Sequence, residues 1–389
     1  MSEADAESGG RVARPSPDAG HYLWLDALRA FAALSVLGYH LIVMGGVDLP
    51  LTSPWGWLHF GFLGVDLFFA LSGAVMVIST RRLMVNPAAG WRKTFLRRRL
   101  ARIVPLYFAS CVLFLLVVEP FRLQQDDTLW NLVSHALFVH NLFPALHGAL
   151  NGPSWSLGVE MQFYALLLLI APWALRVSPA WLLISATLVS LAWRLLTFSA
   201  VAPMDEAQGA GHGFFLATQL PGVLLGFAGG AAAARLLEAR RDAASHRPRS
   251  LASILVLTLL AWIAAGAALL HLQAGYWTRL AGLLGAYAAV CLATSMSIWL
   301  ALRLPAPPRS LAPLIRGAGN LSYGIYLWHA GVILLLLRLP ELPKPALVLA
   351  CLGMTLALSW TGWRLLERPC LRWARRRPTG TVAPRQAGA

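Results

Sequence analysis

The chain has 389 residues, of which 58% are hydrophobic and only 13% are charged. A soluble domain carries about 25% charged residues, so the composition excludes a large water-soluble fold and favours a protein embedded in lipid. The net charge of +15 is typical of nucleic-acid binding, but the basic residues lie in short segments between apolar runs and not on one soluble module, which argues against that class.

The chain begins with a polar stretch, 1–20, that is expected to be a disordered cytoplasmic tail and lacks the basic start and cleavage site of a signal peptide. A helix needs about 20 apolar residues to cross a bilayer. We therefore predict an all-α, polytopic integral membrane bundle, with a membrane domain over 21–370 and a basic cytoplasmic tail over 371–389. The apolar runs predict about ten transmembrane helices, at 22–44, 58–79, 103–119, 155–175, 180–200, 214–235, 251–271, 278–301, 320–338 and 345–366.

Arginine-rich connections alternate along the chain with connections that are poor in basic residues. The segments 81–102, 235–249 and 303–316 are rich in arginine, whereas 120–150 and 201–213 are not. Lys and Arg concentrate in cytoplasmic loops, so all the rich segments share one side only if the number of spans is even and both termini are cytoplasmic. Ten spans satisfy this condition. The long outer loop 120–150 is expected to be folded and not a free linker.

The cysteines lie in or at the ends of apolar runs, and no two of them have a metal-ligand spacing. We interpret them as small buried side chains, and we expect no metal site. They are Cys111, Cys291, Cys351 and Cys370.

Ionisable residues inside membrane helices are costly and usually line a cavity or a pathway. Arg29 and His40 are eleven positions apart, so they share one face of the first span, about 16 Å apart along its axis. His40 is expected in the outer half, and Glu160, near the start of the fourth span, at a similar depth, where the two would be natural partners. The structural alternatives are that Arg29 snorkels to head groups, that His40 binds a carbonyl group and that Glu160 reaches interfacial water.

Three further spans carry polar residues. Asp66 begins the second span, and Tyr326 and His329 share a face of the ninth, although Asp66 could be interfacial and His329 a satisfied core residue. Arg99 and Arg102 stand at the start of the third span on the cytoplasmic side. Their planar guanidinium groups suit phosphate oxygens, and the alternative is a topology signal with anionic lipid contact.

Taken together, segments along about residues 22–366 make the chain resemble the acyltransferase-3 superfamily, whose members are membrane-embedded acyltransferases. The matching residues are Arg29 with His40; Gly64-Val65-Asp66-Leu67-Phe68-Phe69 followed by Leu71-Ser72-Gly73; Arg99 and Arg102 with Ile103, Pro105 and Tyr107; Trp155-Ser156-Leu157 with Glu160, Phe163 and Tyr164; and Ser322-Tyr323 with Tyr326, Leu327 and His329. The chain departs from the family pattern at Ala74, where a phenylalanine is frequent, and at Met161, where a second acidic residue is frequent.

The resemblance implies an O-acyltransferase of the bacterial inner (cytoplasmic) membrane. Such an enzyme would move an acyl group, expected to be acetyl, from acyl-coenzyme A to a sugar hydroxyl of a cell-surface glycan or a lipid-linked precursor. It implies catalytic roles for His40 and Glu160, and binding of acetyl-coenzyme A by Arg29, Arg99 and Arg102. Substrate-binding or supporting roles would fall to Asp66, Ser72, Ser156, Tyr164, Tyr326 and His329.

On this hypothesis a neutral His40 takes the proton of the sugar hydroxyl, and Glu160 orients the imidazole or stabilises its protonated form. His40 could instead carry the acyl group transiently. Three alternatives stay open: an acyltransferase for a small secondary metabolite such as a macrolide sugar, a transporter or flippase for a lipid-linked sugar, and a non-catalytic scaffold. The sequence does not identify the acceptor, the acyl chain length or the oligomeric state.

Overall fold

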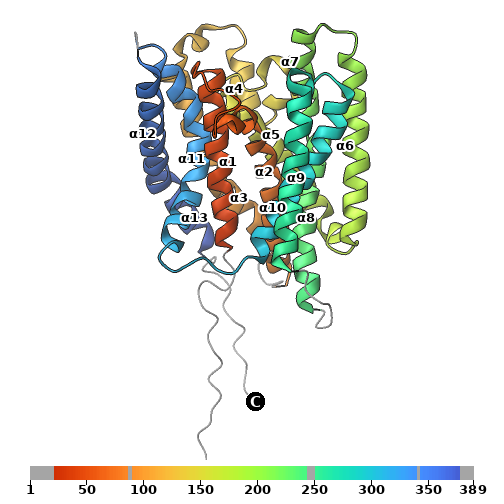
Figure 1. Cartoon of the computed structure of the whole chain (residues 1–389). Coiled ribbons are helices and arrows are strands. Elements are labelled where there is room, and N and C mark those ends of the chain that lie inside the picture. The colour runs from red at the N-terminus through yellow and green to blue at the C-terminus, as the bar shows by residue number, and fades with distance from the viewer. Residues whose placement is uncertain (1–21, 86–89, 243–249, 340–341, 377–389) are drawn as a thin grey trace, which may run out of the picture.

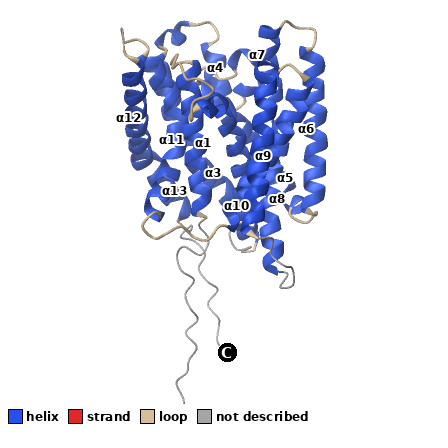
Figure 2. Ribbon diagram, in the orientation of Figure 1, coloured by secondary structure: helices blue, strands red, loops and turns tan. Residues whose placement is uncertain are grey.

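A computed structural model describes residues 22–85, 90–242, 250–339 and 342–376. Within these ranges the chain forms helices and turns, with no strand (Figure 2). The α-helices are α1 (Leu23–Val43), α2 (Gly64–Met84), α3 (Trp91–Leu113), α4 (Thr128–Ala136), α5 (Trp155–Ala174), α6 (Pro179–Val201), α7 (Glu206–Ala217), α8 (Leu220–Asp242), α9 (Leu251–Leu272), α10 (Tyr287–Arg303), α11 (Ala312–Leu336), α12 (Lys344–Gly362) and α13 (Arg368–Arg375).

Ten helical segments in the described ranges are long and apolar enough to cross a membrane. Each coincides with one of the predicted apolar runs, which confirms the all-α membrane fold. The predicted tail 1–20 and residues 377–389 lie outside the described residues. Because α13 is helical as far as Arg375, regular structure extends past the predicted domain boundary at residue 370.

The long helices run side by side in one bundle (Figure 1). In the centre, α1 packs between α11 and α2, and α11 packs in turn against α12. On the other side, α2 packs against α8, which also contacts α6 and α10, and α9 covers α10. The neighbours of α1 are therefore α11 and α2, and this order decides which polar side chains can meet.

Glycine allows the closest helix contact, between α2 and α8. A Cβ atom added at Gly73 would lie 1.9 Å from the carbonyl oxygen of Phe227, and one added at Gly230 would lie 1.8 Å from that of Ala70. No larger residue fits at either place without moving a backbone. Small residues of this kind let membrane helices pack tightly, and here they fix the helix that carries Ser72.

The third helix differs from its prediction. The apolar run predicts a helix that begins at residue 103, but α3 begins at Trp91. A hydropathy pattern assigns the basic stretch before residue 103 to a loop. In the structure this stretch is helical, and its arginine side chains point into a cavity. Arg99 and Arg102 therefore stand within α3 and not at its start.

Three π-helical segments in the described chain adjoin long helices, and in each of them one turn holds an extra residue. Such turns often mark functional places in helices. They are Phe114–Val118 after α3, Ala281–Ala286 before α10, and Trp363–Glu367 between α12 and α13.

The loop between α3 and α5 is folded, as predicted. It contains α4 and several single turns of 3-10 helix. Its His135 and His140 rings stack with centres 4.0 Å apart. The hydroxyl of Tyr107 donates to the carbonyl oxygen of His135 at 3.2 Å, and the Asn151 amide donates to that of Leu327 at 3.0 Å. These bonds attach the loop to α3 and α11.

Candidate functional site

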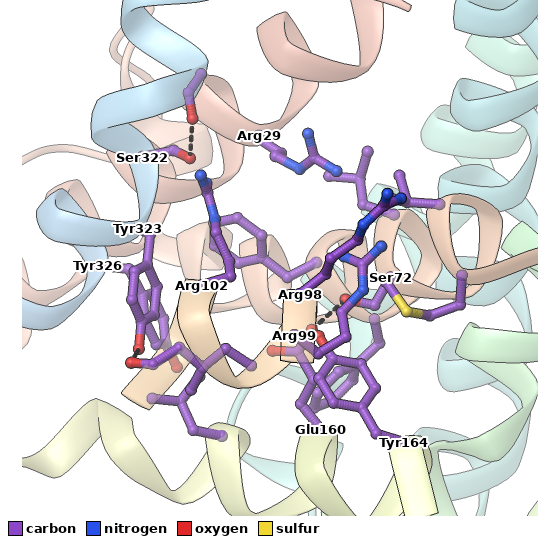
Figure 3. Close-up of a pocket in the computed structure, with 18 of the residues that line it drawn as sticks. Arg29, Ser72, Arg98, Arg99, Arg102, Glu160, Tyr164, Ser322, Tyr323 and Tyr326 are labelled. Atoms are coloured by element: carbon purple, nitrogen blue, oxygen red, sulfur yellow. Dashed lines mark hydrogen bonds between the residues drawn. The ribbon is translucent and has the colours of Figure 1, made fainter. Parts of the chain in front are cut away.

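A cavity of about 470 Å³ lies among α1, α2, α3, α5, α11 and α13 (Figure 3). Asp26, in the first turn of α1, and Arg375, the last residue of α13, both line it. The two ends of the described helical bundle are therefore at the same end of the molecule. Arg98 and Arg375 are exposed to solvent, so the mouth of the cavity lies beside them.

Arginine dominates the charge of this cavity. Five arginines line it, against the carboxylates of Asp26 and Glu160, and four of the guanidinium groups surround one space in Figure 3. A cluster of planar cations in a partly buried space suits a ligand that carries several phosphate groups. The five are Arg29, Arg98, Arg99, Arg102 and Arg375.

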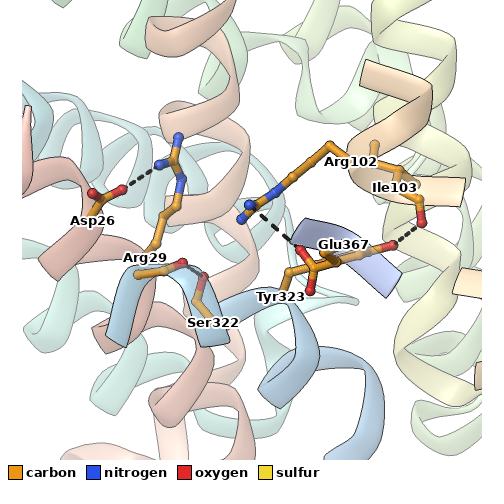
Figure 4. Close-up of polar contacts among 8 residues, drawn as sticks. Asp26, Arg29, Arg102, Ile103, Ser322, Tyr323 and Glu367 are labelled. Atoms are coloured by element: carbon orange, nitrogen blue, oxygen red, sulfur yellow. Dashed lines mark hydrogen bonds and ion pairs between the residues drawn. The ribbon is translucent and has the colours of Figure 1, made fainter. Parts of the chain in front are cut away.

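Only part of this positive charge is neutralised within the described chain. Arg29 Nη1 lies 2.8 Å from Asp26 Oδ1, and Arg102 Nη1 lies 3.6 Å from Glu367 Oε2 (Figure 4). Arg99 donates to the hydroxyl of Ser79 at 3.0 Å. No described carboxylate forms an ion pair with the other cavity arginines, so the cavity has an excess of positive charge.

Glu160 projects into the same cavity from α5. Its Oε1 accepts hydrogen bonds from the hydroxyl groups of Ser72 on α2 and Tyr164 on α5, both at 2.6 Å. Ser72 lies in the middle of α2, so Glu160 is near mid-bundle and within the cavity that the arginines line. This group joins α2 to α5 and leaves the second carboxylate oxygen, Oε2, without a hydrogen bond from either hydroxyl.

Ser156 and Tyr326 mark the end of the cavity that is farthest from the arginines. Their hydroxyl oxygens lie 2.7 Å apart. Tyr326 is the last lining residue along α11, and Ser156 the first along α5, which runs in the opposite sense. The cavity thus extends from exposed arginines to a pair of buried hydroxyl groups.

His40 and His329 are not among the lining residues and meet each other one helical turn beyond the cavity. His329 follows Tyr326 by three residues on α11, a rise of about 4.5 Å. It is completely buried, and its Nε2 lies 3.1 Å from Nδ1 of His40. The predicted site is therefore divided into a cavity and an adjacent histidine pair.

The carbonyl partners of this pair identify the nitrogen that carries each proton. Nδ1 of His329 lies 3.0 Å from the Ile325 carbonyl oxygen, and Nδ1 of His40 lies 2.9 Å from that of Val36. A carbonyl oxygen only accepts, so both Nδ1 atoms carry hydrogen. His329 Nε2 is then a second acceptor for His40 Nδ1–H, which it shares with the Val36 carbonyl oxygen, and the lone pair of His40 is on its Nε2.

The expected pairing of His40 with Glu160 is wrong. In the described chain, the side-chain hydrogen-bond partner of His40 is His329, whereas those of Glu160 are Ser72 and Tyr164. Helix order gives the reason: α1 packs against α11 and α2, and α5 is not one of its main neighbours.

Asp66 also lies apart from the cavity. It lies near Tyr276, in the loop between α9 and α10. Burial raises the pKa of the Tyr276 hydroxyl, the Asp66 carboxylate raises it further, and the Arg194 guanidinium opposes this rise. Arg194 is only 1% exposed and donates to the carbonyl oxygens of Gly222 at 2.8 Å and Leu283 at 3.2 Å. Asp66 thus belongs to a second polar cluster, apart from the cavity.

Sequence reasoning missed three charged residues that line the cavity, Asp26, Arg98 and Arg375, and also Glu367, which contacts the lining residue Arg102. Arg98 had a signal, because it is four residues before Arg102 and so shares its helix face. Asp26 had a similar signal three residues before Arg29. Glu367 directly follows the last predicted apolar run, inside the predicted membrane domain 21–370, and no role was predicted for it. Among the described residues, no group of three or more His, Cys, Asp or Glu is placed to hold a metal ion.

Comparison with known proteins gives matches along most of the chain. A family model for the acyltransferase domain of the acyltransferase-3 type matches residues 22–364. The O-acetyltransferase OatA of Staphylococcus aureus is 31% identical over 188 residues, which are 43% of this chain and 28% of OatA. YrhL of Bacillus subtilis, provisionally named a peptidoglycan O-acetyltransferase, is 26% identical over 369 residues, 89% of this chain and 54% of YrhL.

A third relative is ORF330 of the Acidianus two-tailed virus, provisionally named an acetyltransferase. It is 27% identical over 303 residues, which are 78% of this chain and 80% of ORF330. The chain spans about a quarter of OatA and about half of YrhL. No solved structure matches it.

Proposed function

This chain belongs to the acyltransferase-3 family, and we propose that it is an integral membrane O-acetyltransferase that moves an acetyl group from acetyl-coenzyme A to a hydroxyl group of a cell-envelope sugar. One observation carries the proposal: an arginine-lined cavity ends one helical turn from His329, whose Nε2 contacts His40, the ring that has its lone pair on Nε2. The names of OatA and YrhL support acetyl as the group that is moved, and the name of YrhL supports a peptidoglycan acceptor.

The donor would bind with its phosphate groups among the cavity arginines. Coenzyme A is made in the cytoplasm, and the arginine-rich end of a bacterial inner-membrane protein is expected to face that side. The thin pantetheine arm would then extend toward Tyr326 and bring the thioester close to the histidines. The span from Arg29 to His40, about 16 Å along α1, is one that an extended arm can cover.

Glu160 would guide this arm. Its Oε1 is occupied by two hydroxyl donors, so Oε2 is free to accept from an amide N–H of the pantetheine arm. Ser72 and Tyr164 hold the carboxylate in place for that contact. Glu160 is thus proposed as a binding residue, and not as the partner of the catalytic histidine.

In the proposed reaction, the sugar hydroxyl oxygen attacks the thioester carbonyl carbon while His40 Nε2 takes the hydroxyl proton. The carbon–sulfur bond then breaks, and the thiolate receives that proton from the imidazolium. The products are the O-acetyl ester and free coenzyme A. His329 supports the step because its Nε2 accepts from Nδ1–H of His40, a bond that strengthens when His40 becomes positively charged.

The test is acetyl transfer by the purified full chain in lipid nanodiscs, with acetyl-coenzyme A and a peptidoglycan glycan fragment. Mass spectrometry would detect one added acetyl group on the glycan, and thiol release would give the rate. His40→Ala should abolish transfer, whereas the control His212→Ala, at an exposed histidine of α7, should not change it. A normal rate for His40→Ala would overturn the role of His40, and an acetyl group found on His40 would replace direct attack by a two-step route.

A further inference from the structure

The chain continues as ordered helix beyond the part that the family model matches. That match ends at residue 364, but the π-helical turn ends at Glu367 and α13 follows it to Arg375. Both segments pack against α3, the helix that carries the cavity arginines. From α13, Leu371, Ala374 and Arg375 line the cavity. A segment outside the matched domain thus forms part of the wall of the site.

Glu367 is the second unusual feature of this segment. Its side chain is completely buried, and neither carboxylate oxygen receives a hydrogen bond from the described chain. Its nearest cation is Arg102, at 3.6 Å, and Figure 4 shows the arginine reaching toward it from α3. A buried ion pair with this single long contact adds little stability, because it lacks the hydrogen bonds that offset the loss of water, but moving Arg102 away leaves the buried carboxylate unpaired and therefore has a cost.

We propose that the segment Glu367–Arg375 is a phosphate-recognition element of the donor site. Arg375 supplies a cation at the mouth of the cavity, and Glu367 holds Arg102 until a phosphate group of the donor displaces it. The inference rests on the proposed function, because it takes a coenzyme A thioester as the donor.

Arg102 and Glu367 have opposite effects on the affinity for the donor. A phosphate group accepts two parallel hydrogen bonds from a guanidinium group, which Glu367 does not do at 3.6 Å. Arg102 therefore forms stronger hydrogen bonds when a phosphate group replaces Glu367 as its partner. The loss of the Glu367 contact subtracts a fixed free energy from donor binding. A ligand with several phosphate charges can meet that cost, whereas a small monoanion cannot, so the pair favours nucleotide-linked donors over free carboxylates.

The test measures binding of coenzyme A to the full chain in nanodiscs by calorimetry. Arg375→Ala should weaken binding roughly tenfold, the effect of losing one guanidinium–phosphate contact. The matched control is Arg372→Ala, which removes an exposed arginine of the same helix that does not line the cavity. Glu367→Gln, which keeps the shape but removes the charge, should tighten binding several-fold.

Each result decides a separate question. Two results would overturn the inference while the proposed function stands, provided that the wild-type chain binds coenzyme A. One is equal affinity of Arg375→Ala and Arg372→Ala for coenzyme A, and the other is weaker binding by Glu367→Gln. If the wild-type chain does not bind coenzyme A, the proposed function itself fails. Pantetheine, which lacks phosphate, should bind Arg375→Ala and wild type with equal affinity. Weaker pantetheine binding by Arg375→Ala would show that the substitution disrupts the whole site, and would also overturn the inference.

Discussion

The paired imidazoles of His40 and His329 are the most informative contact in the structure. His329 has no exposed surface, and both of its ring nitrogens have partners, Ile325 and His40. A buried histidine with such satisfied contacts would serve structure alone if its partner were another carbonyl group. Its partner is instead His40, the histidine proposed for acyl transfer, so His329 joins the Val36 carbonyl group in holding the Nδ1 side of that ring.

Substitution at His329 should reveal this positioning role. His329→Leu leaves the Val36 carbonyl oxygen as the remaining acceptor for Nδ1–H of His40 and should lower kcat about 10²-fold, with little change in the KM for acetyl-coenzyme A. His329→Gln offers an amide oxygen in a similar place and should recover part of the rate. Initial rates of thiol release would check the order of wild type, Gln and Leu. Equal rates for wild type and Leu would show that His329 only fills space.

Much of the site could be predicted at the level of single residues. Ser72, Ser156, Tyr164, Tyr326 and the predicted arginines line the cavity as expected, because ionisable and hydroxyl groups in a membrane helix turn away from lipid. Spacing along one helix cannot tell which helices are neighbours. For this reason the sequence did not separate Glu160 from His40, and did not place Asp66 in the cluster with Tyr276 and Arg194.

Between elements, the contact of α2 with α8 holds Ser72 in place. Gly73→Ala should force the two backbones apart and cost about 1–3 kcal/mol of stability, and thermal unfolding in detergent would measure it. Gly226→Ala is the matched control on α8, because a Cβ there would meet Phe69 at 3.7 Å, an ordinary contact. If both variants unfold at the same temperature, the close contact does not limit stability.

The folded outer loop should be sensitive to acid. Burial lowers the pKa of His135 to about 4, and burial and the charge of His135 lower that of His140 to about 3. An unfolded histidine titrates near pH 6.5, so these two residues contribute fully to stability above that pH. Their contribution falls as the pH drops from 6.5 toward 4 and 3.

A pH series of thermal unfolding would check this expectation. The unfolding temperature of the wild type should fall between pH 6.5 and 4. His140→Gln keeps a donor for the Ser154 carbonyl oxygen but cannot titrate, so its curve should be flatter. The same slope in both proteins would contradict the assignment.

The helices themselves were more predictable than their ends. Apolar runs long enough to cross a bilayer predicted all ten spanning segments. The start of α3 and the whole of α13 were missed because hydropathy counts arginine as a residue of loops. In both places, arginines face a polar cavity inside the bundle, where charge is tolerated.

For the whole molecule, the cavity mouth and both ends of the described chain share one end of the bundle, and we expect that end to face the cytoplasm. Cys370 on α13 offers a probe, because it is half-buried, whereas Cys111, Cys291 and Cys351 are buried. A membrane-impermeant maleimide should label the protein in inverted vesicles and not in intact cells. Cys370→Ser should abolish labelling, and labelling of intact cells would reverse the orientation.

The π-helical turn at Trp363–Glu367 has a consequence for how a helix can acquire a new role. It takes up one surplus residue within a helical segment that is continuous from Lys344 to Arg375. Wound as a plain α-helix, the same residues would rotate everything beyond them by about 100°, and Arg375 would point away from α3. The surplus residue in this turn is thus what directs Arg375 toward the cavity, and a variant with one residue removed from the turn would lose that direction without any change in the side chains of α13.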